Sequence, residues 1–401
     1  MQSKPLNGKS ALTVGCTAHV VQDGLTATIY VLLPVLAQSF GLSYTQVGLF
    51  KGVKSLAQAL LEMSSGVVTE RIGELRVIVI GLLLSAAAYA GLAAAPNATL
   101  ILLCLLVIGA GTAFQHAPAS ALIVTAYPVD GRRGPLGLYN SSGDIGKLIY
   151  TGLFSVMIGA GLAWQNISFA FGLSAGVAGV AIALLMRAFS SASAAQAATA
   201  EQGDDDPGLG WGILNWRSYS TLLAIIFFDT MVQAGVLVFV AFLMLAKGLP
   251  LAIATSATVI VLIGGIFGKA GCGFLADRIG VRRAFVLIQL LTAVGLIGVV
   301  IAPAWLAMLL LVPLGVVVQG STSITYGFAA DLIHAQRMAR GYALLYSSAS
   351  LSSVAGPLVF GVAADAYGIE FAVHSMAAVA LLAALPLAFL PTVAARQTDS
   401  I

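Results

Sequence analysis

Long apolar runs recur along almost the whole chain, and they constrain its fold more than any other feature. A single helix needs about 20 predominantly apolar residues to cross the hydrocarbon core of a bilayer. Runs of this length, separated by turn residues, predict twelve membrane-spanning helices, near 12–39, 46–69, 76–95, 98–124, 135–162, 165–188, 218–246, 252–276, 283–302, 304–331, 338–366 and 369–391.

The composition leads to the same conclusion. Of the 401 residues, 59% are hydrophobic and 9% are charged, whereas a soluble domain carries about 25% charged residues. The mean hydropathy is +0.98. We therefore expect lipid to surround most of the chain. The first apolar run is too long for a cleavable signal peptide, so it is expected to be retained as a helix.

A polar segment divides the apolar runs into two sets of six. Residues 189–217 are rich in Ala and Ser and contain Asp204, Asp205 and Asp206, a composition typical of a flexible linker. We expect an N-terminal six-helix bundle over 1–188, a cytoplasmic linker over 189–217 and a C-terminal six-helix bundle over 218–401.

The basic residues predict the orientation of the helices. If both termini are cytoplasmic, all twelve arginines fall in cytoplasmic loops or tails, and the opposite loops carry essentially only Lys247. Positively charged loops stay on the cytoplasmic side of a membrane. The sequence therefore predicts an all-α membrane protein with its N- and C-termini inside the cell.

The two predicted halves share an internal repeat with an offset of 207 residues (273 − 66). The segment GVVTERIGELR from Gly66 corresponds to GFLADRIGVRR from Gly273, and RGPLGLYNSS from Arg133 corresponds to RGYALLYSSA from Arg340. Because six is an even number, both halves have the same predicted topology, which makes this a parallel repeat.

Within this repeat the chain resembles the major facilitator superfamily, whose signature G-x-x-x-D-R-x-G-x-R-R lies between the second and third helices of a half. The second copy matches it closely, and the first has Glu70 in place of the Asp. The resemblance implies the major facilitator fold and a role for these loops in closing the cytoplasmic face. With the repeat mates Glu62 and Lys269, the predicted cytoplasmic gate comprises Glu62, Glu70, Arg71, Lys269, Asp277, Arg278, Arg282 and Arg283.

A second resemblance is to the fosmidomycin-resistance-like branch of drug–proton antiporters. It rests on His19-x-x-x-Asp23, on GAGTAFQHAPAS from Gly109 and on Gly143-Asp144-Ile145-Gly146. The chain departs from that branch in two places. It has FQHAP where the branch has a contiguous Phe-His-Pro, and it lacks the Gly-Pro pair in the fifth helix.

Ten ionisable side chains fall inside the predicted spans, where insertion scales give a charge a cost of several kcal/mol. They are His19, Asp23, Lys51, Lys54, Glu62, His116, Asp144, Lys147, Asp229 and Lys269. Helical spacing places those of one helix along a single stripe. We expect these stripes to face the bundle interior or water.

A buried carboxylate that takes up and releases a proton could couple transport to a proton gradient. Asp23 is the first candidate, followed by Asp229 and Asp144. A buried lysine could hold an anionic substrate, although Asp144 and Lys147 could instead form a structural ion pair. His19, on the same helix face as Asp23, could share or relay its proton, whereas His116 could simply bond a neighbouring carbonyl. The predicted substrate-binding or coupling residues are Asp23, His19, Lys54, His116, Asp144, Lys147, Asp229, Tyr30, Gln319 and Tyr326.

These features predict a proton-coupled secondary active transporter that moves a small organic solute, favoured to be an anion, by alternating access in the plasma (inner) membrane. The expected partners are the solute, protons and the bilayer, with no nucleic acid, and the chain is expected to act as a monomer. No enzymatic, cofactor or metal pattern is evident in the sequence.

Two alternatives stay open at this point. One is a proton-driven multidrug exporter of cationic or neutral lipophilic compounds, in which Asp23, Asp144 and Asp229 would meet the cation. The other is a transporter-like receptor or assembly factor that moves nothing.

Overall fold

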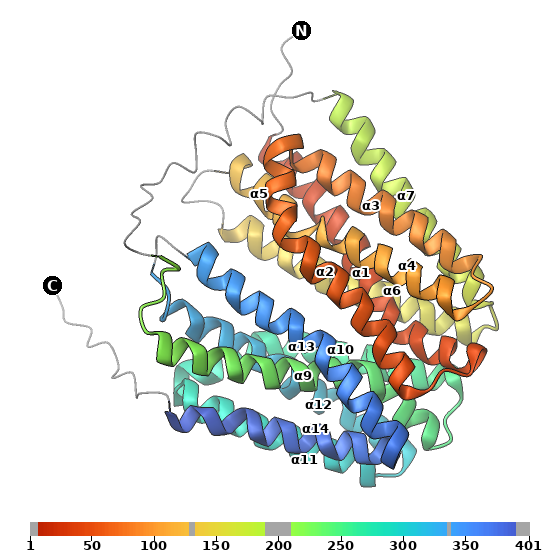
Figure 1. Cartoon of the computed structure of the whole chain (residues 1–401), viewed down its shortest axis with the longest axis vertical. Coiled ribbons are helices and arrows are strands. Elements are labelled where there is room, and N and C mark those ends of the chain that lie inside the picture. The colour runs from red at the N-terminus through yellow and green to blue at the C-terminus, as the bar shows by residue number, and fades with distance from the viewer. Residues whose placement is uncertain (1–6, 128–132, 189–209, 335–337, 390–401) are drawn as a thin grey trace, which may run out of the picture.

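The computed structural model describes residues 7–127, 133–188, 210–334 and 338–389, which are almost entirely helical (Figure 1). The first set of helices is α1 (Gly8–Phe40), α2 (Tyr44–Ile72), α3 (Glu74–Ala93), α4 (Ala98–Ala113), α5 (His116–Ala126), α6 (Arg133–Gly159) and α7 (Trp164–Ala188). The second set is α9 (Trp216–Ala246), α10 (Leu251–Ile279), α11 (Val281–Ile301), α12 (Ala304–Ala330), α13 (Met338–Tyr367) and α14 (Ile369–Ala384), followed by the short 3₁₀ helix η4 (Leu385–Phe389).

Helices occupy the described part of each predicted span, with a break at 114–115 in the fourth, and ten helical segments among the described residues are long and apolar enough to cross a membrane. Helices α2 and α6 are not among these ten. Both carry charges in their middle sections, Lys51 and Lys54 in α2 and Asp144 and Lys147 in α6. The all-helical membrane fold is therefore confirmed, whereas the number of twelve spans and the orientation stay predictions.

The fourth predicted span, 98–124, is present as one apolar segment, Ala98–Ala126, but two helices form it rather than one. Helix α4 ends at Ala113 and α5 begins at His116. Pro118 has no backbone N–H to donate to the carbonyl of Phe114, and its ring would clash with that carbonyl in a regular helix. The interruption places His116 in the first turn of α5. The last span ends in η4, which contains Pro386.

Local sequence signals account for several helix ends. The side chains of Asn7, Ser43 and Asn97 accept backbone N–H groups at the starts of α1, α2 and α4, which satisfies donors that have no partner within the helix. The repeat mates Gly73 and Gly280 have φ of 87° and 85°, and each joins two helices. A side chain is strained in this conformation, so the signature glycines perform the same task in both copies.

Figure 1 shows α1–α7 on one side of the molecule and α9–α14 on the other, with α2 packed along α13 and α6 along α10 between them. The α2–α13 contact is close at the end that holds Tyr44. There the Asp365 carboxylate accepts the N–H groups of Tyr44 and Thr45 at 2.9 and 2.8 Å. Gly48 in α2 lies directly against the backbone of Pro357 in α13. The division into two six-helix domains stays a prediction.

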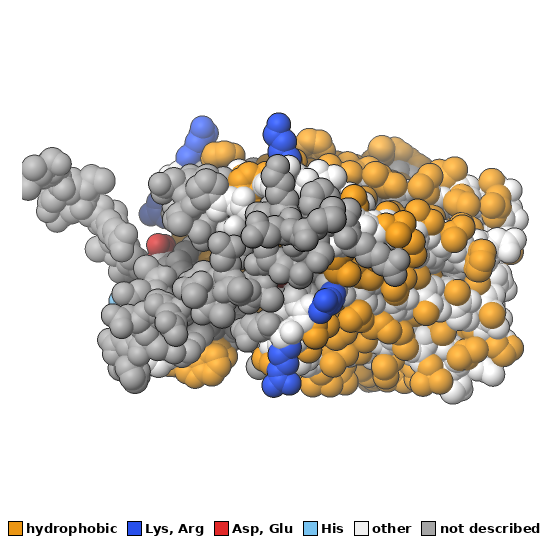
Figure 2. All heavy atoms as spheres, turned by 90° about the horizontal axis from the view of Figure 1, so that it is seen from above, with side chains coloured by type: hydrophobic (Ala, Val, Ile, Leu, Met, Phe, Trp, Pro, Cys, Tyr) orange, Lys and Arg blue, Asp and Glu red, His pale blue; other side chains and the backbone are white. Residues whose placement is uncertain are grey.

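Hydrophobic side chains cover much of the outer surface. In Figure 2 they spread over most of the visible body, whereas lysine and arginine side chains gather toward one end. The exposed hydrophobic residues include Leu60, Val156, Phe267 and Phe274. An apolar exterior of this kind suits lipid, which replaces water as the solvent around a membrane-spanning bundle.

Candidate functional site

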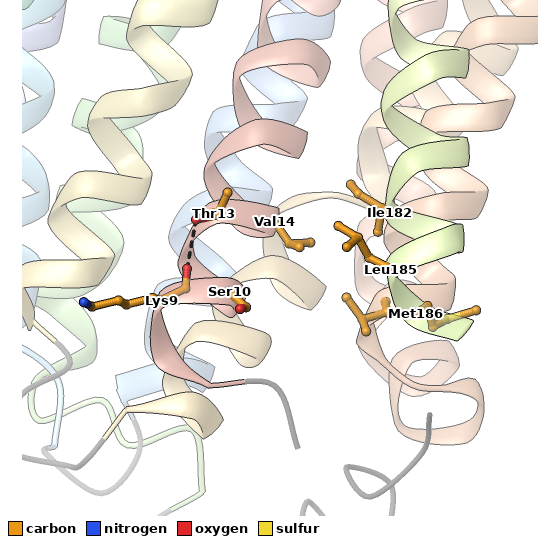
Figure 3. Close-up of a pocket in the computed structure, with 8 residues that line it drawn as sticks. Lys9, Ser10, Thr13, Val14, Ile182, Leu185 and Met186 are labelled. Carbon is orange, nitrogen blue, oxygen red and sulfur yellow. Dashed lines mark hydrogen bonds between the residues drawn. The ribbon is translucent and has the colours of Figure 1, made fainter. Parts of the chain in front are cut away.

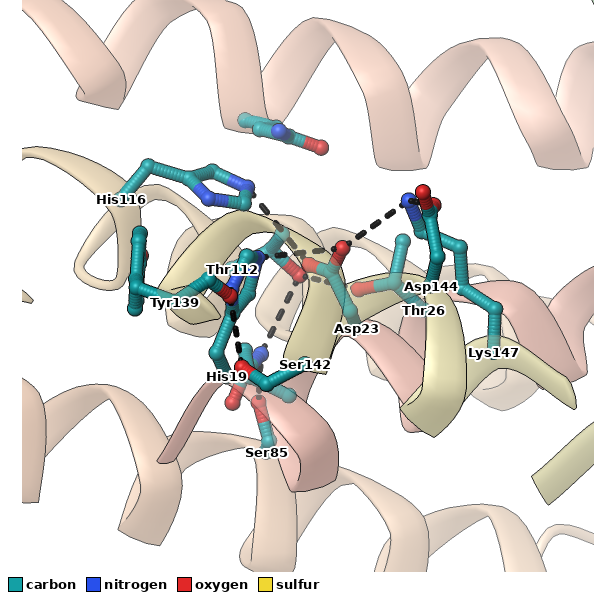
Figure 4. Close-up of polar contacts among 12 residues, drawn as sticks. His19, Asp23, Thr26, Ser85, Thr112, His116, Tyr139, Ser142, Asp144 and Lys147 are labelled. Carbon is teal, nitrogen blue, oxygen red and sulfur yellow. Dashed lines mark hydrogen bonds and ion pairs between the residues drawn. The ribbon is translucent and has the colours of Figure 1, made fainter. Parts of the chain in front are cut away.

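The Asp23 carboxylate lies at the centre of a buried charged cluster between α1, α5 and α6 (Figure 4). Its Oδ2 is 3.3 Å from His19 Nε2 and 3.1 Å from Lys147 Nζ, and its Oδ1 is 3.6 Å from His116 Nε2. The side chains of His19 and Asp23 are 6% and 8% exposed. Four of the predicted site residues thus meet at one point.

His19 is held in a fixed orientation by its neighbours. Its Nδ1 lies 2.8 Å from the carbonyl oxygen of Tyr139, and its ring stacks on the Tyr139 ring with centroids 4.2 Å apart. A Cβ at Gly143 would lie 2.6 Å from His19 Nε2 and 2.9 Å from Asp23 Oδ2. The glycine of the Gly143-Asp144-Ile145-Gly146 segment therefore makes room for the His19–Asp23 contact.

A row of ion pairs continues from Asp23 to the second set of helices. Lys147 Nζ donates to Asp144 Oδ1 at 3.0 Å, and Lys269 Nζ in α10 lies 2.9 Å from the same oxygen. The structural pairing considered for Asp144 and Lys147 is therefore present. In addition, the row links α1 through α6 to α10, and Lys269, predicted as a gate residue, forms its end.

A second buried carboxylate, Asp229 in α9, has a different environment. It accepts hydrogen bonds from Gln289 Nε2 at 2.6 Å, from Ser321 Oγ at 2.8 Å and from Gln233 Nε2 at 2.8 Å. The residue is 4% exposed. Among the described residues, no lysine, arginine or histidine forms an ion pair with it.

Two lysines of α2 are also buried, and neither forms an ion pair among the described residues. Lys51 and Lys54 are 3% and 1% exposed. Lys51 Nζ donates to Ser55 Oγ and Lys54 Nζ to Gln58 Oε1, both at 2.6 Å. The five ion pairs found in the described part of the chain include neither lysine. Lys51 Nζ also lies 5.1 Å from the ring centroid of Tyr30.

The ion pairs of the Asp23 cluster include none of the remaining predicted site residues. Gln319 is buried in α12, where its side chain fills the space beside Gly265. Tyr326 contacts the ring of Tyr346, with centroids 5.5 Å apart. Glu62 is partly buried in α2.

Among the described residues, the predicted gate residues of the signature loops form no ion pairs. Arg71, Asp277, Arg278, Arg282 and Arg283 are exposed, and none of the ion pairs among the described residues includes them. The Glu70 side chain is outside the described set. Their action as a closed gate therefore stays a prediction.

Two of the neutral side chains around Asp229, Gln233 and Gln289, were not predicted from the sequence. Gln233 lies one turn after Asp229 in α9, and this spacing was a usable signal. Gln289 and Ser321 come from α11 and α12, so their contact with Asp229 depends on helix packing that no local pattern encodes. Gln22 forms a related contact in the first set of helices, where its Nε2 donates to Ser85 Oγ at 2.7 Å.

A groove of about 290 Å³ lies elsewhere, between the start of α1, α3 and the end of α7 (Figure 3). Its lining is mostly apolar and contains none of the predicted site residues. The lining residues are Lys9, Ser10, Thr13, Val14, Leu75, Ile182, Leu185 and Met186.

Solved structures resemble the whole fold. A bacterial homologue of the human lysosomal transporter Spinster, in an inward-facing and occupied conformation, matches with a TM-score of 0.80 and 16% identity over 97% of both chains. Its inward-facing and unoccupied form matches with a TM-score of 0.81 and 15% identity over 96% of both chains. At these identities the likeness shows the fold alone.

Sequence comparisons point to the same group of proteins. An uncharacterized MFS-type transporter, YfnC of Bacillus subtilis (strain 168), is 29% identical over 152 residues. This match spans 36% of the chain and 36% of that relative. The family model described as Major Facilitator Superfamily matches residues 16–268 and 222–400. Because these matches together cover most of the sequence, the chain belongs to the Major Facilitator Superfamily and is a transporter rather than an enzyme.

Proposed function

We propose that the protein is a proton-coupled secondary active transporter of a small organic anion. One observation carries the proposal: Asp229, Lys51 and Lys54 are almost fully buried, and none has an opposite charge within ion-pair distance among the described residues. Burying an unpaired charge is costly. In a transporter, that cost is relieved when the missing charge arrives as substrate or as a proton.

The two lysines supply the argument for an anion. Their ammonium groups are one turn apart on α2 and donate to a hydroxyl and an amide. Neither partner neutralises a positive charge. A carboxylate or phosphonate placed beside Lys51 and Lys54 would provide charge-assisted hydrogen bonds, which are about twice as strong as neutral ones.

Asp229 supplies the argument for a proton. Two amides and a hydroxyl solvate its carboxylate, but they bring no positive charge. A proton is the smallest cation that can neutralise it there. A transmembrane carboxylate that alternates between charged and neutral forms is a common element of proton relays.

The coupling role therefore moves from Asp23, the first candidate by sequence, to Asp229. Asp23 and Asp144 both have lysine partners. We assign these two carboxylates to positioning Lys147 and Lys269. The same pairing weakens the case for a multidrug exporter, because it occupies the carboxylates that would meet a cationic drug.

The transport step we propose is alternating access between two six-helix halves in the plasma (inner) membrane, with both termini inside the cell. The close contact of α2 and α13 near Tyr44 and Asp365 would then lie on the external side. The exposed signature loops would lie on the cytoplasmic side, in the state where that side is open.

A thermal-shift screen in detergent tests the anion assignment. Small carboxylates and phosphonates are compared with lipophilic cations on the wild type, on Lys54→Ala and on the exposed-lysine control Lys9→Ala. A ligand at a hundredfold excess over its Kd stabilises the folded state by about 2.7 kcal/mol. We expect stabilisation by an anion in the wild type and Lys9→Ala, and its loss in Lys54→Ala. Stabilisation by cations alone would contradict the proposal and favour the exporter.

A further inference from the structure

Three metal-ligand groups converge in the Asp23 cluster. The ligand atoms of His19, Asp23 and His116 all lie within 4.8 Å of one another. We propose that these three side chains bind a divalent transition-metal ion such as Zn²⁺ or Co²⁺, in competition with the ammonium group of Lys147. This inference is independent of the proposed proton coupling, because it concerns a second cation at the other carboxylate.

The distances suit such an ion. Bonds of about 2.0–2.1 Å in a tetrahedral site place neighbouring ligand atoms about 3.3 Å apart. Asp23 oxygens lie 3.3 Å from His19 Nε2 and 3.6 Å from His116 Nε2. These two distances run to different oxygens, Oδ2 and Oδ1, so an ion bound to one of them requires the Asp23 carboxylate or a histidine ring to turn. One ligand atom from each of the three residues already lies within 4.8 Å of the other two.

The hydrogen bond of His19 supports the same assignment. A carbonyl oxygen can only accept, so the contact with Tyr139 requires the hydrogen on His19 Nδ1. The other ring nitrogen, Nε2, then faces Asp23 Oδ2 at 3.3 Å. Nε2 is therefore the atom that His19 can offer to a metal ion. Histidines that bind metals commonly donate their other ring N–H to a backbone carbonyl in this way.

Two of the three proposed metal ligands are buried, and the third is partly accessible to solvent. His19 and Asp23 are buried, and Gly143 leaves just enough space beside them. The His116 side chain is 36% exposed. Three protein ligands with an open fourth position are typical of metal sites that bind an exchangeable group. The geometry therefore suits reversible binding rather than a closed structural site.

Lys147 is the competitor. Its Nζ lies 3.1 Å from Asp23 Oδ2, so an ion bound there would displace it. Lys147 already donates to Asp144, which can keep it after displacement. Removing the ammonium group should therefore strengthen metal binding, whereas damage to an ordinary structural cluster would weaken any binding.

The test measures metal binding by the purified full-length protein in detergent, with no transport step. Zn²⁺ affinity is measured by calorimetry, and Co²⁺ coordination by its visible absorption bands and their loss on adding Zn²⁺. We expect saturable binding by the wild type, a loss of about tenfold or more in affinity in His116→Ala, and a gain of about tenfold in Lys147→Met. The exposed-histidine control His374→Ala should bind as the wild type does.

The wild-type Co²⁺ spectrum keeps the test decisive if a variant does not fold. Bands typical of tetrahedral nitrogen and oxygen ligands support the site, and their absence together with no measurable Zn²⁺ binding overturns it. Weaker binding in folded Lys147→Met, or binding lost in His374→Ala but retained in His116→Ala, also overturns it. None of these results would alter the thermal-shift outcome for anions, so failure of either proposal is recognised separately.

Discussion

The two sets of helices each bury a carboxylate near the middle of their first helix, but they surround it differently. Asp23 in α1 contacts Lys147 and two histidines. Asp229 in α9 contacts two glutamines and a serine. The repeat mate of Asp229 is not Asp23 but Gln22 (229 − 207 = 22). A duplicated fold has thus placed a neutral amide in one half where the other half has an acid.

This difference separates two uses of a buried carboxylate. Asp23 forms an ion pair with Lys147. Lys147 also pairs with Asp144, and Asp144 pairs in turn with Lys269. Neutral hydrogen bonding leaves the charge of Asp229 without a fixed counterion. We therefore assign the positioning of Lys147 and the proposed metal binding to Asp23, and proton exchange to Asp229.

The largest expected effect comes from breaking the ion pair at Asp23. Lys147→Ala leaves Asp23 buried without its ammonium partner, and removing one member of a buried pair costs about 3–5 kcal/mol. The double variant Asp23→Asn with Lys147→Ala should recover much of this loss, because the uncompensated charge is gone. The free energies of unfolding of the single and the double variant are both measured on detergent-solubilised protein. Equal losses in the single and double variants would show that the pair is not coupled.

A smaller effect reports the charge of Asp229. Gln289→Ala removes a donor at 2.6 Å. Its loss should cost about 1.5–3 kcal/mol while Asp229 is charged and about 0.5–1.5 kcal/mol once it is neutral. We expect the cost, measured by unfolding, to fall as the pH is lowered.

Gln22→Ala is the matched control for this measurement. Its partners, Ser85 and Thr112, are neutral, so its cost should not change with pH. A pH-independent cost for Gln289→Ala would mean that Asp229 does not change its charge over the range tested.

The smallest effect is expected at the end of the row of ion pairs. The Lys269 side chain is 38% exposed, and partly exposed pairs contribute about 0.2–1 kcal/mol. A double-variant cycle of Lys269→Ala and Asp144→Asn should give a coupling energy in that range. A larger coupling energy would mean that the Lys269–Asp144 pair is less accessible to water than the exposure of Lys269 indicates.

Much of the fold follows from the sequence because apolar length and turn residues are local signals. Helices occupy the described part of each predicted range, apart from the break in 98–124, and the junction glycines Gly73 and Gly280 behave alike, as the repeat predicts. The break before His116 was missed, although Pro118 marks it. Long apolar runs hide a proline that interrupts a helix without ending the membrane span.

The site was predicted as a set of residues but not as an arrangement. Helical spacing identified His19 and Asp23 as neighbours, and the structure confirms their contact at 3.3 Å. The contacts of Asp23 with His116 and of Asp144 with Lys269 join distant segments. Such contacts depend on the close approach of helices, as at Gly146, where α6 lies directly against the backbone of Val20. Because the sequence does not specify this packing, a carboxylate with an ion-pair partner cannot be distinguished by sequence from one without.

Proton movement in reconstituted vesicles shows whether Asp229 couples the movement of protons to that of the anion. The protein is placed in liposomes with a pH indicator inside, and a gradient of an anion identified by the thermal-shift screen is imposed. We expect anion-dependent proton flux in the wild type and in the control Gln22→Ala. In Asp229→Asn we expect that flux to be lost, while exchange of labelled for unlabelled anion continues. Undiminished proton flux in folded Asp229→Asn would show that Asp229 does not couple proton and anion movement.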